Sequence, residues 1–240
     1  TEALFNRLRP EINLRCEMSV EQDIDLRSKS DAQVAEAILK KAAGIKGRAG
    51  SQPNSVRYTA PSFIETGSDA IQELVERLNR TEFAINKMTG EVVSPEFLKE
   101  PLRIGQGVYQ CGIGGLHSTH DKRVYARDTG EYLISDWDVA SYYPNIMLKA
   151  GLTPRLEGGA GERFIEAYRD IYTRRMEAKH AGNTKVANAL KISLNGTFGK
   201  LGSPYSSFYS PDLMLAVTLT GQLNLLCLIY EIEFHLSIKV

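Results

Sequence analysis

The chain has 240 residues, of which 42% are hydrophobic and 24% are charged, as in a globular protein with a buried core. These values exclude a disordered, collagen-like or disulfide-stapled chain. The 29 Lys and Arg residues equal the 29 Asp and Glu residues, so binding to a nucleic acid would require local clusters of charge. Three widely spaced cysteines predict a reducing compartment, and the charged N-terminal segment contains no signal-peptide core.

Three helices are predicted in the first part of the chain. Apolar residues at helical spacing mark a helix over 2–17, and Ser30-Asp31 opens a second helix that Gly44 closes. A third helix covers about 69–80, where apolar residues again form one stripe.

A basic segment separates the second and third helices. Between Glu36 and Glu65 the sequence contains no acid but has five bases, namely Lys40, Lys41, Lys46, Arg48 and Arg57. The segment is either a solvated surface loop or a loop that contacts phosphate groups, and the sequence leaves both interpretations open.

The middle of the chain is predicted to be rich in strands. Two strands, over 123–126 and 132–139, are joined by a turn, and period-two alternation puts Asp136 and Asp138 on one face of the second strand. A carboxylate at the end of a strand, just before a helix that begins near Tyr142, is suited to Mg²⁺. On spacing alone, an aspartate at the end of a strand is more often a residue that caps a helix or forms a turn.

Two helices over 162–181 and 183–200 are predicted to form an antiparallel hairpin around a tight turn. Residues 174–200 contain six bases and one acid, a local net charge of +5. On the second helix one face collects a cation, two amides and an aromatic ring, in the set Thr184, Asn188, Lys191, Asn195 and Phe198. This face suits a nucleoside triphosphate, although a solvated polar face has the same pattern.

The last predicted helix raises the question of a membrane span. Residues 213–230 form a run of 18 residues without a charge, and this length is close to the lower limit for a helix that spans a membrane. Four polar residues interrupt the run, and a serine, a proline and an aspartate at 210–212 mark a helix start. We therefore expect the core helix of a globular protein.

Three motifs, in order, resemble those of family B DNA polymerases. Asp138-Val-Ala-Ser-Tyr-Tyr-Pro144 resembles the D-x-x-S-L-Y-P motif, called motif A, and Lys191-Ile-Ser-Leu-Asn-Gly-Thr-Phe-Gly199 resembles K-x-x-x-N-S-x-Y-G, called motif B. The segment 112–118 is similar to a Gly-Gly segment that precedes motif A, especially in viral and bacteriophage members. The resemblance covers about residues 100–235 and, more loosely, the N-terminal helices.

The resemblance implies an α+β fold, with part of a polymerase palm that carries a helical fingers hairpin. In this interpretation, residues 1–100 form an N-terminal helical region with the basic loop, and 101–161 form the first part of the palm with motif A. Residues 162–200 form the fingers, and 201–240 form a palm helix and the start of a further strand.

The resemblance also implies roles in two-metal nucleotidyl transfer from a deoxynucleoside triphosphate to a primer 3′-hydroxyl. Asp138 would bind both Mg²⁺ ions, the Val139 carbonyl would bind the nucleotide-associated ion, and Tyr143 would exclude a 2′-hydroxyl. The remaining residues would contact the triphosphate (Arg175, Lys179 and Lys191, oriented by Asn195), the nascent base pair (Phe198) and DNA (Gly114, Gly115 and Lys200).

Four departures from the family pattern qualify this expectation. Tyr142 replaces leucine, Gly196 replaces serine, and Phe198 replaces tyrosine. The family also has a second metal-binding carboxylate after motif B, whereas the last aspartate of this chain is Asp212. The expectation is therefore a part of a polymerase that is inactive by itself.

Three functions remain in competition at this point. The first is the palm and fingers part of a bacteriophage-type or viral DNA polymerase in the cytoplasm of a bacterium or infected host. Its partners would be primer–template DNA, deoxynucleotides and the remainder of the polymerase, without a membrane. The second is a split or truncated module that binds nucleotide or DNA without catalysis. The third is an unrelated α+β protein in which the motifs arise by chance.

Overall fold

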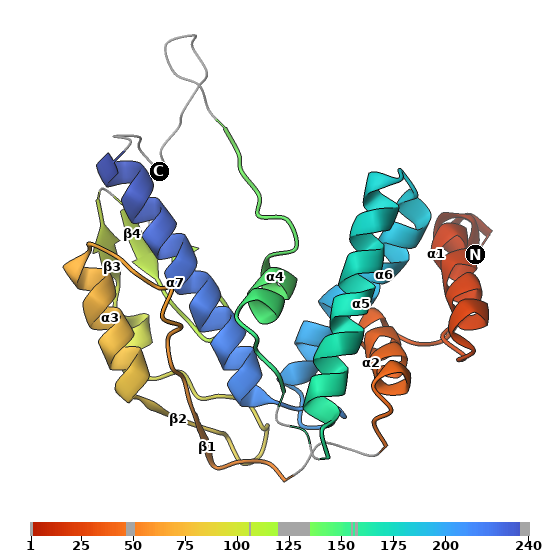
Figure 1. The fold of residues 1–240 in the computed structure, drawn as a ribbon, viewed down its shortest axis with the longest axis horizontal. Helices are drawn as coiled ribbons and strands as arrows, with labels where there is room; N and C mark the ends of the chain where they lie inside the picture. The colour runs from red at the N-terminus through yellow and green to blue at the C-terminus, as the bar shows by residue number, and fades with distance from the viewer. Residues whose placement is uncertain are drawn as a thin grey trace. The chain divides into compact units, whose positions relative to one another are not determined.

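The computed structural model describes residues 2–46, 51–105, 107–119, 135–154, 156 and 158–235. The fold is mixed α+β, 57% helical, with small antiparallel sheets, which confirms the predicted class. The chain divides into two compact units (Figure 1). Unit 1 comprises residues 1–54, 85–91 and 147–214, and unit 2 comprises residues 55–84, 92–146 and 215–240.

Among the described residues, four helices lie wholly within unit 1, and all four were predicted. They are α1 (Glu2–Gln22), α2 (Asp31–Ala42), α5 (Ala160–His180) and α6 (Thr184–Leu201). Helix α2 begins at a capping box, in which the Ser30 hydroxyl accepts the Gln33 backbone N–H and the Gln33 side chain accepts the Ser30 N–H. Gly44, with a φ of 62°, follows its last turn as predicted. Helix α2 packs against α5 and α6.

The predicted helical hairpin is confirmed. Gly182 adopts a φ of 70° in the turn, and the Asn183 side chain caps α6 by accepting the Val186 backbone N–H at 3.2 Å. The hydroxyl of the buried Tyr168 on α5 donates to the Leu194 carbonyl on α6 at 3.4 Å. This bond puts Tyr168 and Leu194 at the same level along the hairpin. The hairpin is thus an ordered, packed element.

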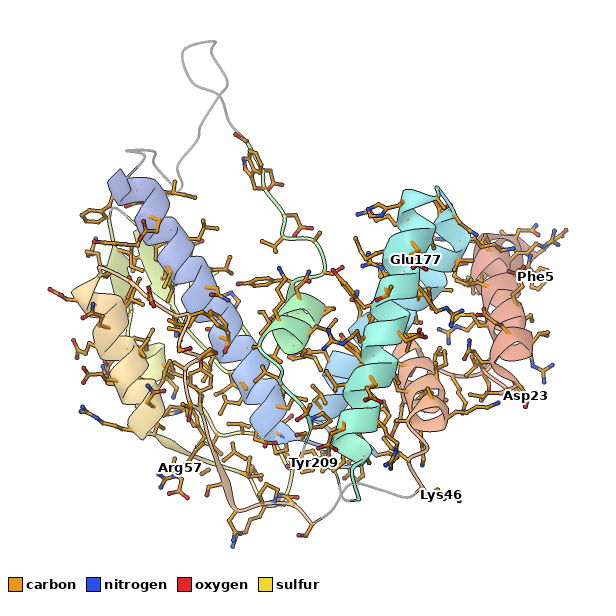
Figure 2. All side chains as sticks on the ribbon, in the orientation of Figure 1. Phe5, Asp23, Lys46, Arg57, Glu177 and Tyr209 are labelled. Carbon is orange, nitrogen blue, oxygen red and sulfur yellow. The ribbon has the colours of Figure 1, made fainter. Side chains whose placement is uncertain are left out.

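The first half of α1 keeps its apolar stripe in solvent. Phe5 is 50% exposed and projects from the helix (Figure 2), with the Arg9 guanidinium 5.2 Å from its ring centroid. Only Met18, near the end of α1, is buried among the residues of this helix. The C-terminal turns of α1 therefore provide its packing within unit 1.

In its described residues, unit 2 contains two small antiparallel sheets. Strand β1 (Ser55–Arg57) pairs with β2 (Glu82–Ala84), and α3 (Asp69–Arg80) lies between them in the chain. Strands β3 (Leu102–Ile104), β4 (Gly107–Gln110) and β5 (His117–Ser118) form a sheet in that order, after a short 3₁₀ helix, Glu96–Lys99. Helices α4 (Tyr142–Lys149) and α7 (Pro211–His235) contribute residues to both units.

Two of the polar residues that interrupt α7 have partners elsewhere in unit 2. The Thr220 hydroxyl lies 3.0 Å from the hydroxyl of the buried Tyr58. The Gln222 side chain accepts the Gly112 N–H at 2.9 Å and donates to the Gly112 carbonyl at 2.8 Å. By length and composition Pro211–Phe234 could cross a membrane, a test that buried core helices also pass, and 56% of its apolar window is buried. The hydrogen bonds favour the predicted core helix.

The predicted strand over 132–139 is wrong where the structure describes it. Residues 135–139 have no strand structure and are exposed, with Trp137 89% exposed (the green trace before α4 in Figure 1). Alternation puts Asp136 and Asp138 on one face and Ser135, Trp137 and Val139 on the other, but neither face is buried in the structure. The other predicted strand, 123–126, and residues 132–134 lie outside the described residues.

Candidate functional site

The motif B helix, α6, separates a packed face from an exposed polar face. Leu190 and Leu194 are buried, whereas Lys191 and Asn195 are exposed and Phe198 is half-buried. This separation follows from the 3.6-residue period, because positions 191 and 195 lie about 40° apart around the helix and about 100° or more from position 190. Phe198 follows the buried Leu194 by one turn, so it lies at the boundary of the packed face. The helix can therefore present an ammonium, an amide and a ring edge to a ligand without loss of core packing.

The second helix of this site, α5, carries the other two predicted phosphate contacts. Lys179 is exposed, and Arg175 is half-buried near Tyr168. Burial raises the pKa of the Tyr168 hydroxyl, and the positive charge of Arg175 partly opposes this effect. With Tyr168 level with Leu194, a rise of 1.5 Å per residue puts Lys191 about 6 Å from Arg175 along the hairpin axis.

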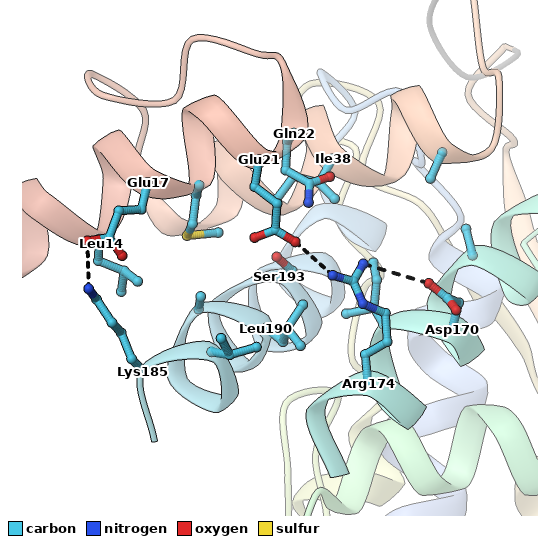
Figure 3. A pocket seen from close by; sticks show the side chains of 16 residues that line it. Leu14, Glu17, Glu21, Gln22, Ile38, Asp170, Arg174, Lys185, Leu190 and Ser193 are labelled. Carbon is cyan, nitrogen blue, oxygen red and sulfur yellow. Dashed lines mark hydrogen bonds and ion pairs between the residues drawn. The ribbon is translucent and has the colours of Figure 1, made fainter. Parts of the chain in front are cut away.

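Two of the six bases in residues 174–200 are paired with carboxylates of α1. Arg174 lies 2.7 Å from Glu21, and Lys185 lies 2.6 Å from Glu17 (Figure 3). Both ion pairs are largely exposed, so each contributes little stability, but each reduces the positive charge that a polyanion would meet. Sequence reasoning missed these pairs, although the i, i+4 spacing of Glu17 and Glu21 puts both carboxylates on one face of α1.

Lys200, the predicted DNA contact of α6, is paired inside unit 1. Its ammonium lies 2.8 Å from the Glu36 carboxylate of α2, and the two side chains are 19% and 18% exposed. Burial raises the pKa of Glu36, but hydrogen bonds from Lys200 and the Ser207 backbone N–H outweigh burial and leave it below the ordinary value. The contact between Lys200 and DNA stays a prediction, in competition with this pairing.

The bases between Glu36 and Glu65 are also partly neutralised. The Lys41 ammonium, in the last turn of α2, lies 3.3 Å from the Asp23 carboxylate, and the Lys40 ammonium donates to the Ser207 hydroxyl at 3.2 Å. In unit 2, Arg57 lies 3.1 Å from Glu82. Arg48 lies outside the described residues.

Close packing accounts for glycine at position 196, where motif B of the family B polymerases has serine. A Cβ on Gly196 would lie 2.7 Å from the Asp31 carbonyl oxygen and 2.9 Å from the Ala35 Cβ. The first turn of α2 therefore rests directly on the motif B helix, at a separation that only glycine permits.

Motif A forms a loop and a helix start in unit 2. Asp138 and Val139 lie in the exposed segment, and Ser141 adopts a φ of 51°, a left-handed conformation that is uncommon for serine. The Asn145 backbone N–H and side chain donate to the Ser141 and Ala140 carbonyls, both at 3.0 Å. These bonds turn the chain sharply from the carboxylate into α4.

Tyr142, where the family has leucine, anchors α4 on α7. Its hydroxyl donates to the Gly221 carbonyl at 2.6 Å, and its ring packs against Gly221, which has no side chain to displace it. Burial, followed by the influence of Tyr143 and Cys227, raises the pKa of Tyr142 to about 12. The Tyr143 ring stacks on Tyr142 at a centroid distance of 6.1 Å. Tyr143 thus has a fixed neighbour.

The described residues near motif A supply few oxygen ligands for Mg²⁺. Within the described ranges, no group of three or more His, Cys, Asp or Glu residues could hold a metal ion. Asp138 supplies a carboxylate and Val139 a carbonyl, and Asp136 is the next exposed carboxylate. Two cations at the spacing of about 3.5–4 Å used in two-metal catalysis require more negative charge than this set provides.

The Gly-Gly segment, residues 112–118, is hydrogen-bonded at Gly112 and has free space around Gly114 and Gly115. Gln222 binds both backbone groups of Gly112, while β5 pairs with β4 after the segment. Gly114 and Gly115 have no positive φ, and a Cβ at either position would meet no atom within 4 Å. The described fold therefore does not itself require glycine at these positions.

The predicted site residues fall into two groups. Arg175, Lys179, Lys191, Asn195, Phe198 and Lys200 belong to unit 1, and Gly114, Gly115, Asp138, Val139 and Tyr143 belong to unit 2. Comparison of the chain with models of protein families, with curated proteins and with solved structures gives no match.

Proposed function

We propose that this chain is the palm and fingers part of a bacteriophage-type family B DNA polymerase, and that α5 and α6 bind the incoming deoxynucleoside triphosphate. The carrying observation is the exposed face of α6, where Lys191 and Asn195 lie opposite the packed side of the helix. Arg175 and Lys179 lie one turn apart on α5, the partner helix. Three cations on one rigid hairpin suit a polyphosphate, because charge-assisted hydrogen bonds are among the strongest that proteins form.

The unit 2 residues support the same proposal. The ring of Tyr143 stacks on an anchored neighbour, Tyr142, and so could act as a firm wall against a 2′-hydroxyl. Gly114 and Gly115 leave room for the close approach of a DNA backbone. Asp138 and the Val139 carbonyl would hold Mg²⁺ together with carboxylates from the remainder of the polymerase.

The second candidate is a nucleotide-binding module without catalysis. The shortage of metal-binding oxygen atoms among the described residues favours it for this chain alone. Both candidates require the same nucleotide site on the hairpin, so they differ in turnover and agree in binding.

The test of the shared site is calorimetric titration of the chain with Mg·dATP. Loss of one charge-assisted contact, about 1.5–3 kcal/mol, predicts that Lys191→Ala weakens binding by about tenfold or more. The matched control is Lys185→Ala on the same helix, because Lys185 is paired with Glu17 and outside the proposed site. Equal affinities of the wild-type chain and Lys191→Ala, or no binding at all, would remove the nucleotide site.

A further inference from the structure

Unit 1 contains a cavity of about 120 Å³ between α1 and the helices α2, α5 and α6 (Figure 3). Its walls are largely apolar and include Leu14, Met18, Ile38, Ile171 and Leu190. Its rim is charged and includes Glu17, Glu21, Asp170, Arg174 and Lys185. An apolar cavity of roughly this size accepts a single aromatic ring, since an engineered cavity of about 150 Å³ binds benzene.

One buried hydroxyl faces this space. Ser193 on α6 is 0% exposed and lines the cavity, and its Oγ has no hydrogen-bond partner within the described part of the chain. Figure 3 shows the hydroxyl directed toward α1. Buried hydroxyl groups are normally hydrogen-bonded, because desolvation without a partner is costly. The unmatched hydroxyl therefore points to a partner that the chain does not supply.

The rim selects against negative charge. Arg174 lies 2.7 Å from Glu21 and Lys185 lies 2.6 Å from Glu17, so both cations have carboxylate partners. Three carboxylates and two cations leave the rim with a net charge of −1. An anionic ligand would meet repulsion here without gaining a strong cationic partner.

We infer that this cavity binds a compact, uncharged molecule of about the size of phenol, with an apolar body and one hydroxyl group that hydrogen-bonds to the Ser193 Oγ. The site is independent of the proposed nucleotide site, because Ser193 and Leu190 lie on the packed face of α6 and Lys191 and Asn195 on the exposed face. Its test uses no nucleotide, so the two proposals fail separately.

The experiment is a titration of the isotope-labelled chain with phenol, benzene and benzoate, followed by amide chemical shifts. Phenol is expected to give saturable shifts at residues that line the cavity. The hydroxyl should make phenol bind about threefold to tenfold more tightly than benzene. Benzoate, with the same ring and a negative charge, should bind at least about tenfold more weakly than phenol.

Two variants separate recognition from general hydrophobic uptake. Ser193→Ala should still bind benzene but should lose the preference for phenol. Ala167→Leu, which adds a side chain to the cavity wall, should weaken both ligands. Three results would each overturn the inference: no saturable shift with phenol, shifts confined to unit 2, or an undiminished phenol preference in Ser193→Ala.

Discussion

The ammonium of Lys200 lies 2.8 Å from the carboxylate of Glu36, which ties the last turn of the motif B helix to α2. Both side chains are more than four-fifths buried, and the Ser207 N–H donates to the same carboxylate at 2.7 Å. An ion pair in this setting holds two helices in one arrangement, since separation would leave a largely desolvated charge without its partner.

This ion pair predicts a specific pH dependence of stability. The folded state lowers the pKa of Glu36 below its ordinary value of 4.5. The contribution of the ionised Glu36 side chain to the free energy of unfolding is therefore complete above that pH, and it is lost as the pH falls through the folded pKa. Glu36→Gln should reduce the free energy of unfolding by about 1–3 kcal/mol at pH 7. Urea titrations should show this difference shrinking below pH 4.5. A difference in unfolding free energy between the wild-type chain and Glu36→Gln that stays constant down to acid pH would contradict this prediction. The control is Glu100→Gln, which removes an exposed ion pair and should change the unfolding free energy far less than Glu36→Gln does.

The second prediction concerns the contact between α2 and α6. Gly196→Ala introduces a methyl group 2.7 Å from the Asp31 carbonyl oxygen, so α2 must move, and we expect a loss of about 1–3 kcal/mol. Gly199→Ala is the matched control, because no atom lies within 4 Å of its Cβ position. Its higher helix propensity should stabilise the chain by up to about 1 kcal/mol. Equal effects in thermal unfolding would show that α2 does not rest on Gly196.

The third prediction concerns the Gln222 side chain. Gln222→Met keeps the length of the side chain but leaves the Gly112 N–H and carbonyl without their partner. Unfolding free energy should fall by about 1–3 kcal/mol, and the Gly112 amide should exchange with solvent faster. Leu228→Met, at a position that is 49% exposed, should change neither quantity. An unchanged exchange rate of the Gly112 amide in Gln222→Met would contradict the two hydrogen bonds between Gln222 and Gly112.

The fourth prediction concerns catalysis. The 240-residue chain alone should show no primer extension with Mg²⁺, because its described residues supply too few carboxylates for two ions. Fusion to a palm segment that supplies an Asp-Thr-Asp motif should restore synthesis, and Asp138→Asn should then abolish it. In the same fusion Tyr143→Ala should chiefly admit ribonucleotides. Asp138-dependent synthesis by the chain alone would contradict this prediction.

Helices with local signals were predictable from the sequence. The capping box at Ser30, the left-handed Gly182 and the Asn183 cap all act within a few residues, so a linear pattern contains them. The exposed and packed faces of α6 follow in the same way from the period of one helix. These features account for the hairpin that carries most of the candidate nucleotide site.

Contacts between distant parts of the chain were not predictable from the sequence. The pairing of Gln222 with Gly112, and the approach of Asp31 to Gly196, join segments more than 100 residues apart, and neither has a local signature. The strands of β3 to β5 have two to four residues, which is too short for a clear alternation. The misassigned segment 135–139 shows the reverse case, a regular alternation in which neither face is buried, although Trp137 and Val139 share one of them.

The missing side chain at position 196 also limits how this chain can diverge. The nearest obstacle to a larger residue is a main-chain oxygen, at 2.7 Å, so no substitution on α2 can make room for it. A variant with serine at position 196 must therefore hold α2 farther from α6. Position 196 is therefore a sequence marker for the distance between α2 and α6. We expect glycine there in variants with the close packing, and serine in variants whose two helices lie farther apart.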